Sequence, residues 1–491
     1  MKTVLLFLIA LISLISIHMG TYAHSKQIKQ GVIIVPVADL IGERICTQRA
    51  QDTHGLGYST LPAATGPAPH TSSCLRLHQV LFNELVNIME ETADEIRISV
   101  PNVFYLTSKQ NDTQINTNYW TKRENIAPLE KLKTLEVHIK NIRNIKEIKD
   151  IKDIKNLIPE PISFLNPASI THQNVIALTE PFYDTVTNNH FSVGTRFVLT
   201  PQQNSSGMFT VYLIDWNKKQ ATQTNIPESH ALKSHTLSKS ESIQTFLSLI
   251  KKWSNQTQGL IPYVWGGCSI THKYPRDSHT TTTMTQNEHA ITYFNNQAHN
   301  QLNKINNHDN KLINKSNNLD TKINKKTNTQ AYDLDHNLYN NFNTKNTHEI
   351  AHESTNNSVK TGTDCSGLIV RAAQLSGIPY FYKNTATLVQ KLKTLAQHEK
   401  IESGDLLWIP GHVMIVGDLH KHTLFEARHY IEGFGCIHEI PLSQSFKDIK
   451  TYAQLIQRFH DKKPLERLHR NGSVSKKITQ FKILKLKSVW D

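Results

Sequence analysis

The pattern of hydrophobic and polar positions in the C-terminal third of the chain predicts a helix. Leu368, Ala372 and Leu375 recur at helical spacing, and a Gly-x-Pro sequence follows the last of them. Thr363 or Asp364 can cap the free amides of the first turn. The residue that opens this helix is a cysteine.

A strand hairpin is predicted downstream of the helix. The apolar run 412–416 is followed by a Gly-Asp turn signal and then by a second run, 423–427. Along each strand, successive side chains point to opposite faces of the sheet. If the two residue numbers of every cross-strand pair add up to an even number, the even-numbered residues of both strands lie on one face. In that register Glu426 lies on the same face as His412.

Two sets of short strand patterns precede this region. The first set comprises residues 31–40, 75–82, 96–101 and 118–121. The second set comprises residues 174–178, 194–199 and 209–215. Turn residues bound both sets, which therefore predict two small all-β modules.

Two stretches interrupt the pattern. From Ile139 to Leu157 an apolar residue recurs at every third position. A period of three falls short of 3.6, so the apolar line winds around a helix, and we interpret the stretch as a charged spacer. Residues 269–360 are rich in Asn, Thr, His and Lys, a composition that predicts disorder because it buries too little surface to offset chain entropy. The histidines there lack the tight pairs of a zinc site, and we expect no metal.

The N-terminal residues predict export. Lys2 precedes an apolar run from Val4 to Ile17, and Ala23 offers a small residue for cleavage, as in a secretory signal. No later stretch approaches the roughly eighteen apolar residues of a membrane span. We therefore expect a periplasmic or secreted protein with no membrane span after signal cleavage.

The net charge of the chain indicates its class of partner, and the number of cysteines indicates whether a thiol stays unpaired. The chain has 54 lysines and arginines against 41 acidic residues, which suits a polyanionic partner. We expect no nucleic acid, because no nucleic-acid fold motif accompanies the charge. In an oxidising compartment an odd number of cysteines leaves at least one thiol free. The five are Cys46, Cys74, Cys268, Cys365 and Cys436, of which the first two flank one loop and could pair.

Cys365 is the candidate nucleophile. In the first turn of a helix, the dipole and the backbone N–H groups favour a thiolate, and a nearby imidazolium would lower the thiol pKa to about 3.5–7.5. The same amides can hold an oxyanion. His412 is the candidate base and Glu426 the carboxylate that orients it. The alternatives are a small buried cysteine without chemistry and a solvated glutamate at a strand edge.

Four motifs in order resemble the NlpC/P60 family of cell-wall cysteine peptidases. They are Pro-Tyr-Val-Trp-Gly-Gly at 262–267, Asp-Cys-Ser-Gly-Leu at 364–368, Gly-Asp-Leu at 404–406 and His-Val at 412–413. The resemblance implies a papain-like fold, with helices packed on a central antiparallel sheet. It also implies hydrolysis of peptidoglycan stem peptides between γ-D-glutamate and diaminopimelate, with no cofactor.

The resemblance assigns roles to individual residues. Cys365 would be the nucleophile and His412 the base, and the Tyr263 hydroxyl would lie beside the cysteine and help to hold the oxyanion. Asp364 and Ser366 would contact the free amino end of the substrate in the subgroup that needs an unsubstituted L-alanine. Helix capping alone also accounts for Asp and Ser at these positions.

Two departures from the family stand out. Many members have histidine where this chain has Glu426, and the family usually has a short loop in place of residues 269–360. The strand sets upstream look like bacterial SH3 barrels, and paired modules of this kind precede the peptidase in one multidomain subgroup. That subgroup also ends on a strand, as residues 483–490 suggest here.

The expected fold class is α+β: a papain-like NlpC/P60 catalytic domain preceded by two small all-β SH3-like barrels, with a long insertion predicted to be disordered. The expected division is a signal peptide at 1–23, a first SH3-like domain at 24–135, a Lys/Ile repeat linker at 136–165, a second SH3-like domain at 166–240 and a catalytic domain at 241–491, interrupted at 269–360.

The expected function is that of an exported cysteine peptidase acting on peptidoglycan stem peptides or muropeptides. Two alternatives stay open from the sequence. One is a catalytically silent wall-binding protein in which the insertion disables the site. The other is an acyltransferase or amidase that uses the same Cys-His pair.

Overall fold

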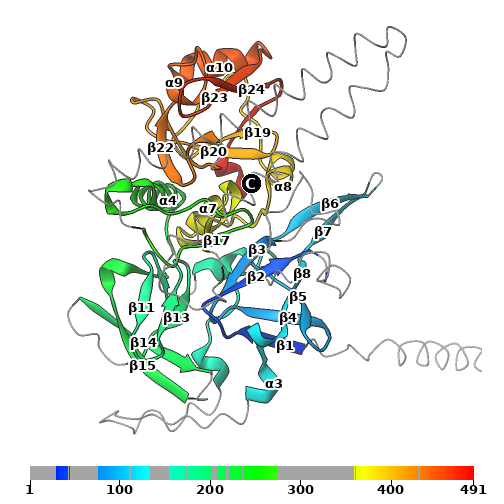
Figure 1. Cartoon of the computed structure of the whole chain (residues 1–491), viewed down its shortest axis with the longest axis vertical. Helices are drawn as coiled ribbons and strands as arrows, with labels where there is room; N and C mark the ends of the chain where they lie inside the picture. Colours follow the sequence, from blue (N-terminus) through cyan, green and yellow to red (C-terminus); the bar gives the residue numbers. More distant parts are fainter. Residues whose placement is uncertain are drawn as a thin grey trace, which may run out of the picture.

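The computed structural model describes the larger part of the chain (Figure 1). The described residues are 29–42, 44, 76–109, 112–132, 154–171, 174–201, 207–216, 220–234, 236–274, 359, 361–429 and 432–491. Several predicted features lie outside them: the signal peptide 1–23, Cys46, Cys74, residues 139–153 of the repeat and 275–358 of the insertion. In the described part of the chain, no helix is long and apolar enough to cross a membrane.

Seven strands near the N-terminus form one antiparallel sheet in the order β3-β2-β8-β5-β4-β1-β9. These strands are β1 (Lys29–Ile33), β2 (Val37–Ile41), β3 (Arg76–Leu81), β4 (Leu85–Glu91), β5 (Glu95–Ser99), β8 (Asn118–Lys122) and β9 (Ile126–Pro128). A hairpin of β6 (Tyr105–Lys109) and β7 (Asp112–Asn116) projects beyond the sheet (Figure 1).

One stretch that the sequence predicts as a single strand is divided at Pro36. The run 31–40 is two strands, because proline has no N–H and cannot occupy the interior of a ladder. The two strands diverge in the sheet, where β1 pairs with β4 and β9 while β2 pairs with β3 and β8.

The second β-rich module consists of three small sheets, β13-β10-β16, β11-β12 and β14-β15. Its strands are β10 (Val175–Leu178), β11 (Phe182–Asp184), β12 (Asn189–Phe191), β13 (Arg196–Val198), β14 (Met208–Asp215), β15 (Gln220–Pro227) and β16 (Ala231–Lys233). In neither module do the described strands close into a barrel, so the predicted SH3-like barrels are not confirmed.

The described end of the linker 136–165 packs between the two modules. Leu157 and Ile158 are buried against Val32 and Leu85 of the first module and Tyr212 of the second. Burial of such side chains stabilises the contact between the modules. This end of the linker is therefore part of the core, where the sequence suggested a charged spacer.

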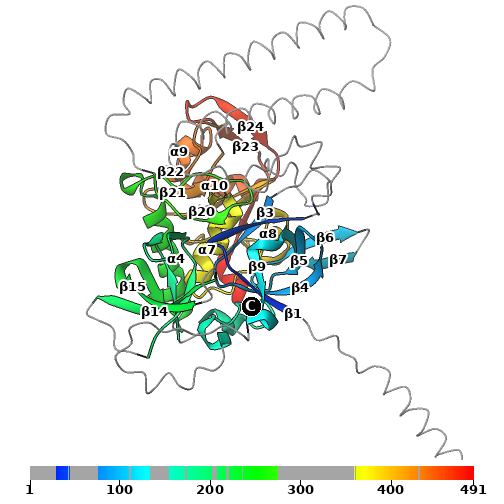
Figure 2. The ribbon, with the colours of Figure 1, turned by 60° about the horizontal axis from the view of Figure 1, so that its bottom comes forward.

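The C-terminal module is a mixed α/β unit. Its antiparallel sheet has the order β22-β21-β20-β19-β25, and two helices, α4 and α7, pack against it. The elements are α4 (Lys239–Ser254), α7 (Cys365–Leu375), α8 (Thr385–Lys391), β19 (Leu406–Ile409), β20 (His412–Val416), β21 (Thr423–Ala427), β22 (Ile437–Pro441), α9 (Leu442–Ser445), α10 (Tyr452–His460), β23 (Leu465–Leu468), β24 (Val474–Ile478) and β25 (Lys482–Leu484). In both ribbon views α7, in yellow, lies between this sheet and the N-terminal modules (Figure 2).

The C-terminal strand is shorter than the sequence suggested. Only Lys482–Leu484 is a strand, and Leu486–Trp490 forms a 3-10 helix. Lys485 marks the change, because its Nζ lies 2.7 Å from Asp405 Oδ2 and its backbone N–H donates to the Lys393 carbonyl. These bonds take the chain out of the sheet after three paired residues.

The two described ends of the insertion meet beside α7. Strand β17 (Cys268–Ser269) pairs with β18 (Gly362–Thr363), and Leu260 pairs with Tyr274. Residues 269–274 therefore belong to the fold, although the sequence placed them in the insertion. Residue 363 leads into the first turn of α7.

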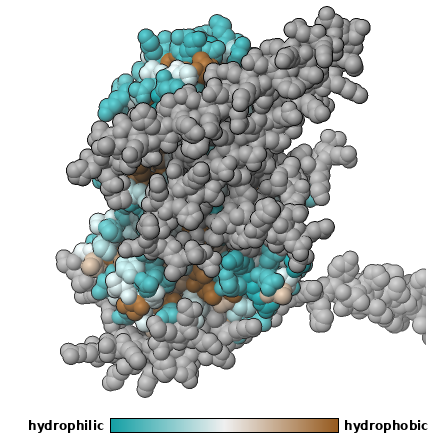
Figure 3. All heavy atoms as spheres, viewed as in Figure 1, coloured by the Kyte–Doolittle hydropathy of each residue, from teal (hydrophilic) through white to brown (hydrophobic). Residues whose placement is uncertain are grey.

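The described surface is mostly hydrophilic over the C-terminal module and has small apolar areas among the β modules (Figure 3). Large exposed apolar side chains in the described residues are scattered: Met89, Ile115, Leu165, Tyr183, Val186, Tyr274 and Val474. Single exposed apolar residues of this kind are normal on a protein surface.

Candidate active site

Cys365 is the first residue of α7, where two contacts fix the turn. The Asp364 side chain caps the helix by accepting the backbone N–H of Gly367. Gly367 is required by packing, since a Cβ at this position would lie 2.0 Å from the carbonyl oxygen of Gly267. The sulfur is thereby held against the sheet on which α7 packs.

Burial decides the protonation of the Cys365 thiol. The backbone N–H groups of Val413 and Ser366 point at the sulfur and favour the thiolate. Burial and then the Asp364 carboxylate act against them and raise the pKa of Cys365 to about 12, with only 7% of the residue exposed. The sequence predicted a lowered pKa from the helix dipole, and that prediction is wrong because burial outweighs the amides.

His412 opens β20 beside this sulfur. The backbone N–H of Val413, the residue after His412, points at the sulfur, which places the start of β20 close to Cys365. His412 Nε2 lies 2.8 Å from Glu426 Oε2, and its side chain is 15% exposed. The carboxylate accepts, so Nε2 carries the proton and Nδ1 keeps the lone pair that a base needs.

Burial also sets the charge of His412. It lowers the pKa of this imidazole, and the hydrogen bond and charge of Glu426 oppose the shift without cancelling it. With the pKa of Cys365 raised and that of His412 lowered, the resting pair is a neutral thiol beside a neutral imidazole. Proton transfer between them must accompany attack.

Glu426 is the centre of a buried charge network. Its side chain is 0% exposed; Arg467 donates to Oε2, and His438 Nε2 lies 3.2 Å from Oε1. Burial alone would raise the pKa of Glu426, but Arg467, His412 and His438 together hold it well below its usual range. Glu426 is therefore ionised and able to stabilise a charged His412.

The strand register explains why these side chains meet. Ile415 pairs with Phe425, so Glu426 lies diagonal to His412 on the same face, as the parity argument predicts. Glu426 pairs directly with His438 on β22. Sequence reasoning missed His438 and Arg467: the pairing of β22 would have revealed the first, but nothing local indicates the second.

Asp364 and Ser366 are engaged within the chain. Lys383 Nζ lies 3.1 Å from Asp364 Oδ2 and 3.5 Å from Ser366 Oγ, and the serine hydroxyl donates to Asp364 Oδ1 at 2.9 Å. The N–H of Gly266 donates to the same carboxylate. The sequence assigned these residues to the substrate, and it gave no sign of Lys383.

Tyr263 lies on a segment that runs beside the nucleophile. It forms a parallel bridge with Thr363, and its buried ring meets His429 edge to face at 5.3 Å. Tyr380 is a second tyrosine near the thiol. Burial, then Tyr382 and Cys365, raise the pKa of Tyr380 well above its usual value, and its hydroxyl has no hydrogen-bond partner among the described residues.

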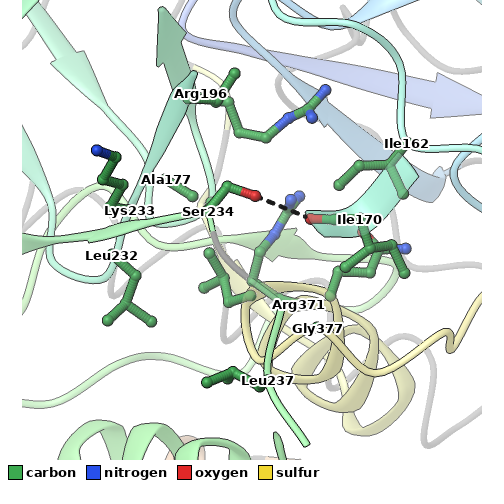
Figure 4. Close-up of a pocket in the computed structure, with 14 residues that line it drawn as sticks. Ile162, Ile170, Ala177, Arg196, Leu232, Lys233, Ser234, Leu237, Arg371 and Gly377 are labelled. Atoms are coloured by element: carbon green, nitrogen blue, oxygen red, sulfur yellow. Dashed lines mark hydrogen bonds between the residues drawn. The ribbon is translucent and has the colours of Figure 1, made fainter. Parts of the chain in front are cut away.

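The described residues contain no group of three or more His, Cys, Asp and Glu side chains arranged to hold a metal ion. Among the described residues, Cys268, Cys365 and Cys436 are buried and form no disulfide. A pocket of about 50 Å³ lies against the C-terminal half of α7, lined in part by Arg196, Leu232 and Arg371 (Figure 4). It does not include the Cys-His pair.

The resting state of the pair can be tested through alkylation. We expect the reaction rate of Cys365 with iodoacetamide in the free protein to rise about tenfold per pH unit from pH 6 to 9, because only the thiolate reacts and the pKa lies near 12. Mass mapping of the Cys365 peptide measures the rate. A rate that is constant over this range and falls in His412→Ala would contradict the neutral pair.

No family model matches the sequence, and no curated protein matches it. Among solved structures, the chain is similar to an NlpC/P60 family protein from Bacillus cereus, with 11% identity, a TM-score of 0.39, and coverage of 84% of this chain and 94% of that one. It is also similar to NlpC2 and NlpC1 from Trichomonas vaginalis, at 8% and 7% identity and TM-scores of 0.25. Those matches cover 84% and 85% of this chain and 94% and 89% of theirs. Scores this low do not establish a shared fold, so the function is inferred from the residues of the site.

Proposed function

We propose that this protein is a cysteine peptidase that hydrolyses amide bonds in peptidoglycan stem peptides. The observation that carries the proposal is the 2.8 Å hydrogen bond between His412 and a buried, ionised Glu426, next to a cysteine that opens a helix. The four ordered motifs, which resemble NlpC/P60 peptidases, support it. A cysteine, histidine and carboxylate in this relation suit acyl transfer through a thioester.

The first half of the reaction forms the acyl-enzyme. His412 Nδ1 takes the thiol proton as Cys365 Sγ attacks the amide carbon, and Glu426 stabilises the imidazolium. The backbone N–H of Cys365, at the positive end of α7, would donate to the oxyanion. His412 then gives its proton to the leaving nitrogen, the C–N bond breaks, and a thioester and a free amine result.

The second half releases the acid. With His412 neutral again, Nδ1 takes a proton from water as the water oxygen attacks the thioester carbon. The intermediate collapses, the C–S bond breaks, and the imidazolium returns its proton to the sulfur. One water is consumed in each cycle.

The substrate follows from the resemblance and from charge. We infer that the scissile bond joins γ-D-glutamate to diaminopimelate, and that the chain is exported to reach the wall. The net charge of +13 suits a polyanionic wall. The two β-rich modules, which we propose to be SH3-like, flank α7 and would shape the substrate cleft.

The proposal is tested with defined muropeptides that contain diaminopimelate. Mature protein and Cys365→Ala are incubated with them, and the products are identified by mass spectrometry. We expect the parent alone to split the γ-glutamyl-diaminopimelate bond, with no effect of chelators. The absence of any stem-peptide cleavage by folded parent protein would refute the peptidase.

One observation favours a catalytically silent wall-binding protein. Cys365 is buried and neutral at rest, which would suit a thiol that no longer reacts. In that case sedimentation with wall fragments would be equal for the parent and Cys365→Ala, and neither would cleave. Transfer of the acyl group to an added amine instead of water would identify an acyltransferase.

A further inference from the structure

Lys383 places a buried ammonium beside the nucleophile. It precedes α8, and its backbone N–H donates to the Phe104 carbonyl at 2.8 Å, which anchors it to the first module. Its Nζ lies 3.1 and 3.4 Å from the two oxygens of Asp364, and its side chain is 4% exposed. An ion pair is therefore built into the first turn of α7.

Groups of the chain itself, including this lysine, fill the hydrogen-bonding capacity of the Asp364 carboxylate. Asp364 accepts the N–H groups of Gly266 and Gly367 and the Ser366 hydroxyl, in addition to Lys383. A carboxylate has about four acceptor sites, and all four are taken. A substrate ammonium that approached Asp364 would meet the ammonium of Lys383, at short range and with little screening by water.

The groups around Lys383 also disfavour a second positive charge. His78 is buried near Lys383, and its pKa is lowered well below the usual value by burial, then by Lys383 and Arg371. Two positive groups therefore act on this region. Neither ring nitrogen of His78 nor the Tyr380 hydroxyl has a hydrogen-bond partner among the described residues.

We propose that Lys383 is a specificity-determining residue, which occupies the place beside Asp364 that the amino end of a free stem peptide would need. The enzyme then acts on stem peptides whose amino end is acylated, as when the peptide is still joined to the glycan. This inference rests on the proposed peptidase function. It departs from what the resemblance implies for Asp364 and Ser366, because the chain supplies the ammonium itself.

The test compares two stem peptides that differ only at the amino end, one free and one N-acetylated. We expect the parent to hydrolyse the acetylated peptide with kcat/KM about tenfold or more above that of the free peptide, because of like-charge repulsion. Lys383→Ala opens an ammonium-sized space beside Asp364, so the ratio of the two kcat/KM values shifts at least about tenfold in favour of the free peptide. Lys383→Arg keeps the charge and the preference of the parent.

Lys485→Ala is the matched control. Lys485 is also a buried lysine paired with an aspartate, 2.7 Å from Asp405, but it lies in the C-terminal turn outside the site. The Lys485→Ala variant reports the general cost of breaking a buried ion pair. Its ratio of kcat/KM values for the acetylated and the free peptide should equal that of the parent. The parent comparison needs no variant, so a misfolded Lys383→Ala leaves the test intact.

The outcomes separate the two proposals. A parent that prefers the free peptide, or that cleaves both within twofold, overturns the role of Lys383 and leaves the peptidase standing. An unchanged ratio in folded Lys383→Ala overturns it as well. Cleavage of neither peptide by the parent overturns the proposed function, and the role of Lys383 with it.

Discussion

Replacing Glu426 by alanine should destabilise the protein by about 3–5 kcal/mol, because the change leaves buried positive charge without its partner. Arg467 and His438 both bond to this carboxylate, and both are buried. Urea unfolding at pH 7, followed by tryptophan fluorescence, measures the difference. The midpoint should fall with little change of slope.

Glu466→Ala is the control for this variant. Glu466 precedes Arg467 on β23, pairs with Lys447 and is 39% exposed, so its loss should change stability by less than about 0.5 kcal/mol. The pH dependence gives a second check. A carboxylate with a lowered folded pKa contributes stability above its unfolded pKa of about 4.3, and this is lost as the pH falls towards the folded value. Equal stability of Glu426→Ala and the parent at pH 7 would contradict the network.

Replacing His412 by alanine should lower kcat/KM for stem-peptide hydrolysis by about 10³-fold or more, since the neutral thiol loses its base. The cost should be large here because the pKa of Cys365 is about 12, so few thiolates form without a base. Product formation from a defined muropeptide measures the loss. Stability should change less than in Glu426→Ala, because Arg467 and His438 still hold Glu426.

His420→Ala is the matched control on the same hairpin. His420 is exposed, in the turn between β20 and β21, and should leave the rate unchanged. Added imidazole should restore part of the activity of His412→Ala and none of Cys365→Ala. A His412→Ala protein that keeps more than about a tenth of the parent rate would show that another group takes the thiol proton.

Local pattern predicts the elements that carry the Cys-His pair. Helical spacing and a cap give the helix that opens with Cys365, and the two apolar runs give the strands of His412 and Glu426. Parity alone places the glutamate on the face of the histidine. The capping box of Ser238 and Glu241 is a further local signal, and it marks the start of α4.

Long-range packing explains what the sequence does not predict. Arg467 reaches Glu426 from a strand forty-one residues away, and Lys383 reaches Asp364 from the segment that follows α7. Neither position has a local signal. The direction of the Cys365 pKa depends on burial, which follows only when the helix, the sheet and the first β module are assembled.

The β modules show the same limit. Short strands were predicted at the correct places, but Pro36 divides one of them, and several partners such as β15 lack a strong apolar alternation. Order within a sheet depends on pairing between distant segments, as for β2 with β8. Closure into a barrel therefore could not be inferred from strand patterns.

The neutral resting pair has a consequence for function. A thiol with a pKa near 12 is protected from oxidation and from chance alkylation while the site is empty. Activation then depends on a substrate that brings a carbonyl to the sulfur, so that His412 removes the proton as the new bond forms. Such an enzyme would be selective among thiol reagents and peptides.

Mass analysis of the protein after rapid acid quench of a reaction with a stem peptide tests the nucleophile most directly. A covalent increment equal to the acyl half of the substrate should appear on the peptide that contains Cys365, and not on those of Cys268 or Cys436, which are also buried and form no disulfide among the described residues. It should be absent in Cys365→Ala. Turnover without any adduct on Cys365, or with an adduct elsewhere, would contradict catalysis by this thiol.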